Sequence, residues 1–95
     1  FAFWGFAPQK KGRRTFFSNV ATSEIPVVFF ESTHRIMKAL DSLIENCPNA
    51  KVYLGRELTK MHEEMLVGKA EELLTILESE PVRQKGEFVV IIENK

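Results

Sequence analysis

The feature that most constrains this chain is a set of short apolar runs bounded by turn or polar residues. The stretch "PVVFFESTHR" (26–35) contains four consecutive apolar residues that stop at Glu31 and are followed by hydroxyl, imidazole and guanidinium groups. The stretches "FAFWGF" (1–6) and "GEFVVIIE" (86–93) are similarly rich in apolar residues. Runs of this length that are apolar on both faces are typical of strands covered on both sides of a sheet. We therefore expect strands at 1–6, 27–31 and 86–93.

Helical patterns separate these strands. We expect a short helix over 13–21, with Phe16, Phe17 and Val20 on one side, and a longer helix over 33–46. The apolar stripe of the longer helix consists of Ile36, Leu40, Leu43, Ile44 and Cys47. A further strand is expected at 51–58. Strands spaced by helices indicate an α/β structure.

Residues 58–80 are ambiguous from pattern alone, since they fit either one long helix or a strand followed by a helix. Gly68 would cost a continuous helix about 1 kcal/mol relative to alanine, which favours a break there. The segment from Ala70 to Ser79 is helical on both interpretations.

Size and composition suit one small domain. The chain has 95 residues, 44% of them hydrophobic, and no apolar run reaches the roughly 20 residues of a membrane helix. A single cysteine, Cys47, fits a reducing, cytoplasmic setting and lies on an apolar stripe, so we expect it in the core. Because the chain begins at Phe1 without an initiator Met, we expect a fragment of a longer protein.

The net charge of zero conceals an asymmetry. Residues 1–35 carry five cations against two acids, and the remainder carries eight cations against eleven acids. Four of the cations, Lys10, Lys11, Arg13 and Arg14, form a compact basic loop within "PQKKGRRTFF" (8–17). Lysine point charges and planar arginine forks are the groups that bind phosphate, although basic loops are also common on ordinary surfaces.

Two polar clusters follow predicted strands. Glu31, Ser32, His34 and Arg35 follow the strand at 27–31, and Ser32 or Thr33 is expected to cap the next helix. Ligands of α/β sheets bind outside the carboxyl ends of strands, and helix N-termini favour anions. A local ion pair between Glu31 and Arg35 would explain the same residues without any ligand.

The second cluster lies in "GRELTKMHEE" (55–64), where Arg56, Glu57, Lys60 and His62 end the strand at 51–58. A solvated charged face is the alternative interpretation. The stretch "MHEEM" lacks the two-histidine spacing of a zinc helix, so no metal site is expected. No glycine-rich phosphate loop occurs in the sequence.

Four motifs together resemble one family. "GFAPQKKGRR", "VVFFESTHRIMKALDSL", "GRELTKMHEEMLVGKAEELL" and "GEFVVIIE" occur in the order and spacing of the C-terminal domain of the ribosomal RNA small subunit methyltransferase I family, within the tetrapyrrole methylase superfamily. The resemblance covers essentially all of residues 1–95. Where the family usually has proline after "ES", this chain has Thr33, which puts the first turn of the following helix in doubt.

The resemblance implies a five-stranded mixed sheet flanked by helices, in which roughly Glu63 to Gly68 form a strand next to 51–57. It implies an S-adenosylmethionine-dependent enzyme that methylates the ribose 2′-hydroxyl of a cytidine in the decoding region of small-subunit (16S) ribosomal RNA. Such enzymes are homodimers that bind the cofactor between two domains, and the N-terminal cofactor-binding domain is absent from residues 1–95. On its own, this domain is therefore expected to be inactive.

Candidate site residues follow from the motifs. A ribose hydroxyl needs a base and in-line positioning, and the candidates at the strand ends are Glu31, Arg35, Arg56, Glu57, Lys60 and His62, with the base unassigned. Lys10, Lys11, Arg13, Arg14, Ser32 and His34 are candidates for RNA contact. A domain of a tetrapyrrole-precursor methyltransferase and a non-catalytic dimerisation module are the alternative functions.

Overall fold

The computed structural model describes residues 1–59 and 62–94, and for 57–59, 62, 63 and 82 it describes the backbone only. The elements follow in the order β1 (Ala2–Phe6), α1 (Arg13–Thr22), β2 (Val27–Glu31), α2 (Ile36–Asn46), β3 (Lys51–Thr59), β4 (His62–Gly68), α3 (Ala70–Ser79), the 3-10 turn η1 (Pro81–Gln84) and β5 (Glu87–Glu93). The predicted strands and helices are confirmed, and the ambiguous segment is a strand that ends at Gly68 before a helix from Ala70.

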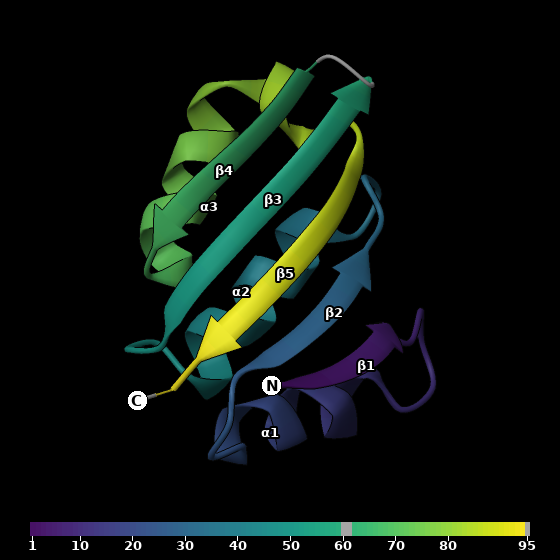
Figure 1. Cartoon of the computed structure of the whole chain (residues 1–95), viewed down its shortest axis with the longest axis vertical. Coiled ribbons are helices and arrows are strands. Elements are labelled where there is room, and N and C mark those ends of the chain that lie inside the picture. Colours follow the sequence, from purple (N-terminus) through teal and green to yellow (C-terminus); the bar gives the residue numbers. More distant parts are fainter. Residues whose placement is uncertain (60–61, 95) are drawn as a thin grey trace.

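The five strands form one mixed sheet in the order β1-β2-β5-β3-β4 (Figure 1). Strands β1 and β2 are parallel, and the pairs β2–β5, β5–β3 and β3–β4 are antiparallel. Because β2 and β3 are both antiparallel to β5, their carboxyl ends lie at the same end of the sheet, its carboxyl edge. The predicted five-stranded mixed sheet is confirmed.

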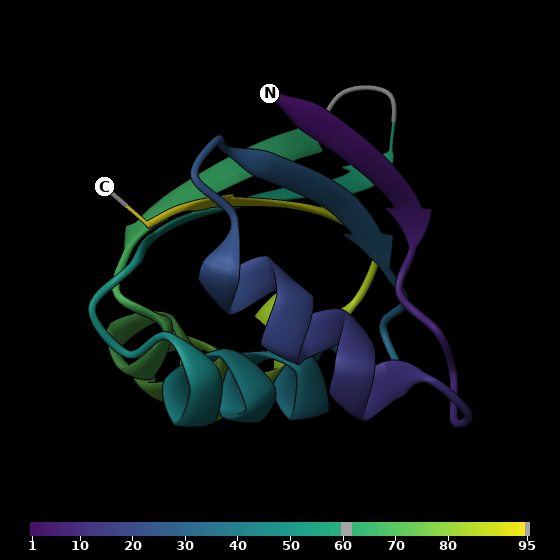
Figure 2. The ribbon, with the colours of Figure 1, turned by 90° about the horizontal axis from the view of Figure 1, so that it is seen from below.

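All three α-helices cover the same face of the sheet (Figure 2). The side chains that alternate toward this inner face are buried, as Phe29 in β2, Leu54 in β3 and Val90 in β5 show. Together with the apolar stripes of the helices they form one core. The buried helix residues are Phe17 and Val20 of α1, Ile36, Ala39, Leu40 and Leu43 of α2, and Ala70, Leu73 and Leu77 of α3.

The prediction that the strand at 1–6 is covered on both sides is wrong for this chain. Strand β1 is an outer strand of the sheet with a neighbour on one side, and Phe3 and Phe6 are exposed. In β5, Val89 is likewise exposed on the outer face, the one that the helices do not cover, whereas Phe88 on the inner face is buried. These strands therefore carry apolar side chains on their outer face that residues 1–95 leave exposed.

The start of α2 also differs from the prediction. The helix begins at Ile36 instead of Thr33, and no side chain caps its first turn. The Thr33 hydroxyl donates a hydrogen bond to the Gly86 carbonyl, and the Ser32 hydroxyl accepts one from Arg35 Nη1 at 3.3 Å. The predicted cap is wrong because both hydroxyls bind other partners.

Cys47 lies in the core at the end of α2, as predicted. Burial raises the pKa of its thiol. In the described parts of the chain, no helix is both long and apolar enough to cross a bilayer.

Candidate functional site

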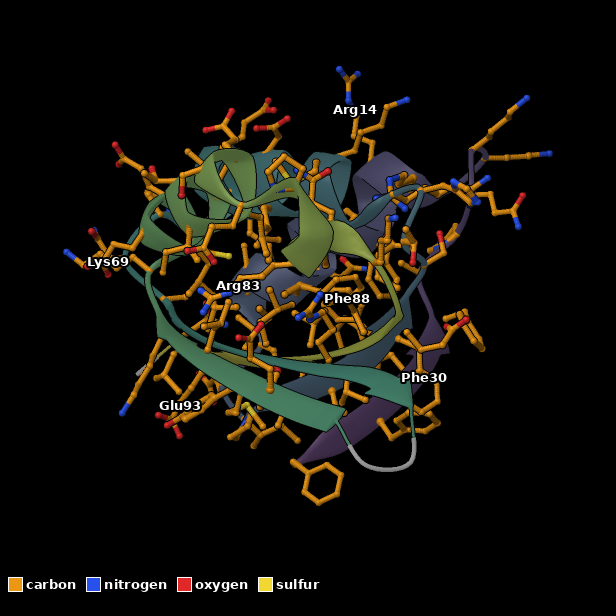
Figure 3. The ribbon with its side chains drawn as sticks, turned by 90° about the horizontal axis from the view of Figure 1, so that it is seen from above. Arg14, Phe30, Lys69, Arg83, Phe88 and Glu93 are labelled. Atoms are coloured by element: carbon orange, nitrogen blue, oxygen red, sulfur yellow. The ribbon has the colours of Figure 1, made fainter. Side chains whose placement is uncertain are left out.

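The two predicted polar clusters lie at the same edge of the sheet, the one formed by the carboxyl ends of β2 and β3. Phe88 of β5 pairs with Glu31 of β2 on one side and with Arg56 of β3 on the other. Two strand spacings, about 10 Å, therefore separate Glu31 from Arg56. Figure 3 shows Phe88 between the sheet and the helices. The clusters share an edge but are divided by a buried aromatic ring.

Glu31 forms an ion pair with Arg13 of the basic loop. Arg13 Nη2 lies 2.8 Å from Glu31 Oε2, and the two side chains are 14% and 3% exposed. Glu31 Oε1 also accepts a hydrogen bond of 3.0 Å from the Ser32 backbone amide. The local pair between Glu31 and Arg35 that the pattern suggested is therefore replaced by a pair between two separate elements.

Arg13 is also held by backbone groups. Its Nη1 donates to the Pro8 carbonyl at 2.9 Å, and its guanidinium lies 5.1 Å from the centroid of the Phe17 ring. This side chain therefore ties the loop before α1 to the carboxyl end of β2. Its guanidinium is engaged with the protein, unlike the exposed charges beside it.

Lys10, Lys11 and Arg14 are exposed. Together with Arg13, the side chains of Lys10 and Arg14 line a groove of about 520 Å³ between α1 and α2. The α2 side of this groove is formed by Ser42, Glu45 and Asn46. Three of the four cations predicted for RNA contact are thus accessible, and two of these three line the groove.

The remaining residues of the first cluster lie around the turn before α2. His34 is exposed, whereas Ser32 and Arg35 are half-buried. Arg35 donates to the Ser32 hydroxyl, which holds the turn that leads away from Glu31. Only His34 presents a largely accessible side chain here.

Arg56 belongs to a chain of ion pairs. Its Nη2 lies 3.2 Å from Glu64 Oε1, and its Nη1 donates to the Lys85 carbonyl at 3.3 Å. The other oxygen of Glu64 lies 3.2 Å from Arg83 Nε, which in turn lies 2.7 Å from Glu80 Oε2. Since Arg56 is 8% exposed, this network braces the edge of the sheet rather than presenting a free cation.

Glu57 and His62 are placed by their backbones alone. Glu57 pairs with Glu63, and Thr59 pairs with His62, where β3 and β4 meet the same edge. Lys60 lies outside the described residues. Glu57 and His62 therefore map to the edge of the sheet by their backbones, without a side-chain geometry.

An open hollow of about 930 Å³ lies on the outer face beside this edge. Its walls are formed mainly by Phe6, Phe30, Met65 and Val89, and Gly55 lies at its floor. A hollow of this size suits a cofactor-sized molecule. Its described lining is mostly apolar, with few groups for the sugar and amino-acid ends of S-adenosylmethionine, so it offers at most one wall of such a site.

Some features of this edge were not predicted. Arg83 joins it from η1, and Gly86 accepts the hydrogen bond of Thr33 from the turn before β5. Arg83 belongs to none of the quoted motifs, and Gly86 opens the motif "GEFVVIIE" without having been singled out as a site residue. Both reach the edge through contacts between distant segments. Among the described residues, no group of three or more His, Cys, Asp or Glu side chains could hold a metal ion.

Sequence comparison finds relatives along the whole chain. A ribosomal RNA small subunit methyltransferase I from Coprothermobacter proteolyticus is 46% identical over 92 residues, which are 96% of this chain and 39% of the relative. The enzyme of the same name from Thermotoga maritima is 33% identical over 95 residues, which are 100% of this chain and 42% of the relative. No family model matches the chain. The chain thus spans about two fifths of the length of these relatives, in their C-terminal part.

Two solved structures of methyltransferases share the fold of this chain. The methyltransferase CobJ matches 99% of this chain and 41% of its own with a TM-score of 0.62 at 17% identity. The cobalamin biosynthetic enzyme cobalt precorrin-4 methyltransferase, CbiF, matches 98% of this chain and 40% of its own with a TM-score of 0.66 at 12% identity. Identities this low establish the fold alone. The identity to the sequence relatives along nearly the whole chain shows that it belongs to the ribosomal RNA small subunit methyltransferase I family and corresponds to its C-terminal part.

Proposed function

We propose that the chain is the C-terminal half of an S-adenosylmethionine-dependent enzyme that methylates the ribose 2′-hydroxyl of a cytidine in the decoding region of small-subunit ribosomal RNA. The names of relatives that are 33–46% identical along the chain support this proposal. A cytoplasmic location and a homodimer of the full-length protein belong to the same proposal. The likeness to cobalamin biosynthetic enzymes is one of fold, so it does not favour a tetrapyrrole substrate.

The contribution of this half is to hold RNA through the basic loop. The observation that carries this role is that Arg13 is anchored on Glu31 while Lys10, Lys11 and Arg14 remain exposed. An anchored loop presents its cations in a fixed arrangement, so less conformational entropy is lost when they bind phosphates. Arg13 is thus a positioning residue in this proposal, and its three neighbours contact the RNA backbone.

The same reasoning divides the catalytic candidates. Glu31, Arg35 and Arg56 are held by partners of their own, so we assign them positioning roles. A base that takes the proton of a ribose hydroxyl must reach it within hydrogen-bonding distance. We therefore assign the general base to Glu57, Lys60 or His62, or to the preceding part of the full-length protein. The polar ends of the cofactor are likewise bound by that preceding part.

The direct test is methylation of small ribosomal subunits by the full-length protein. The modified nucleotide is mapped by its resistance to alkaline hydrolysis, which 2′-O-methylation confers. We expect the triple variant Lys10→Gln, Lys11→Gln, Arg14→Gln to lose at least about tenfold in methylation at fixed enzyme concentration, because three phosphate contacts are removed. Lys69→Gln removes an exposed cation well away from Arg14 (Figure 3) and should retain activity.

Two outcomes would contradict the proposal. Methyl transfer to a tetrapyrrole precursor with none to ribosomal RNA would assign the protein to the other branch of the superfamily. Unchanged methylation by the triple variant would show that the basic loop does not contribute to substrate binding.

A further inference from the structure

The outer face of the sheet is a broad apolar surface. Phe6 is 65% exposed and Met65 is 58% exposed, and Phe3, Val67 and Val89 lie uncovered beside them. Together with Phe30 of β2, these side chains come from four of the five strands, β1, β2, β4 and β5. Contiguous apolar surface of this extent on a soluble protein marks a site where another surface packs.

The chain conformation of β1 adds aromatic rings to this face. The register of β1 against β2 shifts between Phe3 and Phe6, and Gly5 within the shift has a φ of 70°. The irregularity brings both phenylalanines to the side of Phe30, whose ring centroid lies 5.2 Å from that of Phe3 and 5.3 Å from that of Phe6. A regular strand would not place residues three apart on one face.

The charges on this face disfavour a nucleic acid as its partner. Its described charged side chains are Glu87, Glu93 and Lys51, and Lys51 lies over the ring of Tyr53 at 5.2 Å. A sheet that stacks nucleobases also needs cations for the phosphates. The exposed cations Lys10 and Lys11 instead belong to the loop that precedes α1, and Arg14 belongs to the first turn of α1, in the helical layer. An apolar face with an acidic margin suits a protein surface.

The size of the face fits an interface within one chain. Five strands spaced by about 4.8 Å, each about 20 Å long, give a face of about 400 Å². Two such sides bury about 800 Å², which is within the range of about 600–1,500 Å² for interfaces between domains.

The relatives show where such a partner would come from. This chain matches the C-terminal part of proteins more than twice its length, so most of each relative precedes the matched region. Figure 2 shows the N-terminus on the side of the sheet that faces away from the helices. A polypeptide that precedes Phe1 would therefore reach the outer face directly.

We propose that the outer face of the sheet, formed around Phe3, Phe6, Phe30, Met65, Val67 and Val89, is the surface on which the segment of the full-length protein preceding Phe1 packs. The hollow above Gly55 receives apolar side chains of that segment. The proposal depends on the membership of the family and not on the assignment of RNA as substrate.

The test is thiol accessibility in the full-length protein. Val67→Cys places a thiol on the outer face, and Met65→Cys provides a second position in case the first variant fails to fold. The matched control is Lys38→Cys, an exposed position on α2. Each variant reacts with a maleimide reagent, and mass spectrometry of the labelled peptides separates the introduced thiol from other cysteines. Cys47, which is buried, stays unreactive as long as this domain is folded.

In the full-length protein, the thiol at position 67 or 65 should react at least about tenfold more slowly than the thiol at position 38, because packing excludes the reagent. In the 95-residue chain the two rates should be similar. The protection in the full-length protein should not depend on protein concentration.

Equal rates for the face and control positions in the full-length protein would overturn the proposal. Protection that disappears on dilution would assign the face to a second copy of the protein and would overturn it as well. Neither result depends on RNA binding or methylation, so a failure here is distinguishable from a failure of the proposed function.

Discussion

Arg13 and Glu31 join the first turn of α1 to the last residue of β2, with 2.8 Å between Nη2 and Oε2. Glu31 is 2% exposed, so the carboxylate depends on this guanidinium and on the Ser32 amide for compensation of its charge. The ion pair connects the anchored basic loop with the carboxyl edge of the sheet.

Glu31→Gln should destabilise the chain by about 3 kcal/mol, because it leaves the largely buried Arg13 without its counter-charge. Urea unfolding followed by Trp4 fluorescence measures this, since Trp4 packs against Phe16 of α1 at 5.7 Å between ring centroids. Arg14→Gln, which alters the exposed neighbour, should change stability by less than about 0.5 kcal/mol. Equal effects of the two substitutions would show that the pair contributes nothing specific.

The two arginines that bind Glu64 should differ in their contributions. Arg56 is 8% exposed and Arg83 is 30% exposed in their side chains. Arg56→Gln should cost about 2–3 kcal/mol, whereas Arg83→Gln should cost less than about 1 kcal/mol because water screens the exposed pair. Denaturation midpoints of the two variants give the comparison. A larger loss for Arg83→Gln would reverse the assigned order.

Two glycine substitutions separate backbone strain from packing. Gly5 has a φ of 70° and open space around the position of a side chain, so Gly5→Ala should destabilise by about 1 kcal/mol through backbone strain alone. A Cβ atom added at Gly55 would lie 3.4 Å from the end of the flexible Met65 side chain. Gly55→Ala should therefore change the free energy of unfolding by less than about 0.5 kcal/mol. Thermal unfolding of both variants checks the contrast. A loss at Gly55 that matches or exceeds the loss at Gly5 would refute it.

Cys47 should make stability fall in alkaline solution. Burial raises the pKa of its thiol in the folded chain, so folding favours the neutral form. The resulting stabilisation is complete below the ordinary thiol pKa of about 8.5 and is lost as the pH rises through the folded value. The free energy of unfolding should therefore decrease more between pH 7 and pH 10 in the native chain than in Cys47→Ala. Parallel pH profiles for the two proteins would contradict this.

Local pattern predicted the elements well because it reports local physics. The apolar spacing of Ile36, Leu40 and Leu43 identifies α2, and Gly68 marks the end of β4 correctly. The start of α2 was misplaced because Thr33 binds Gly86, which lies 53 residues away in the sequence. Hydroxyls near a helix start predict a cap only when no distant acceptor competes for them.

The candidate site was predicted in position but not in pairing. The pattern identified both polar clusters, and the strand directions bring them to one edge. The choice of Arg13 instead of Arg35 as the partner of Glu31 depends on how α1 packs against β2, which residue spacing does not encode. The aromatic residues of β1 predicted cover on both faces, and the exposed Phe3 and Phe6 show that this chain alone does not provide it.

RNA binding by the basic loop can be measured by titrating the isotope-labelled 95-residue chain with a short RNA that copies the decoding-region helix. Backbone amide shifts are followed by NMR at several salt concentrations. We expect shifts centred on Lys10, Lys11 and Arg14 and on the turn from Glu31 to Arg35. Affinity should fall with salt, and Arg14→Gln should reduce the slope of log affinity against log salt by about one. An absence of shifts at low salt, or an unchanged salt slope in Arg14→Gln, would contradict the role of the basic loop in RNA binding.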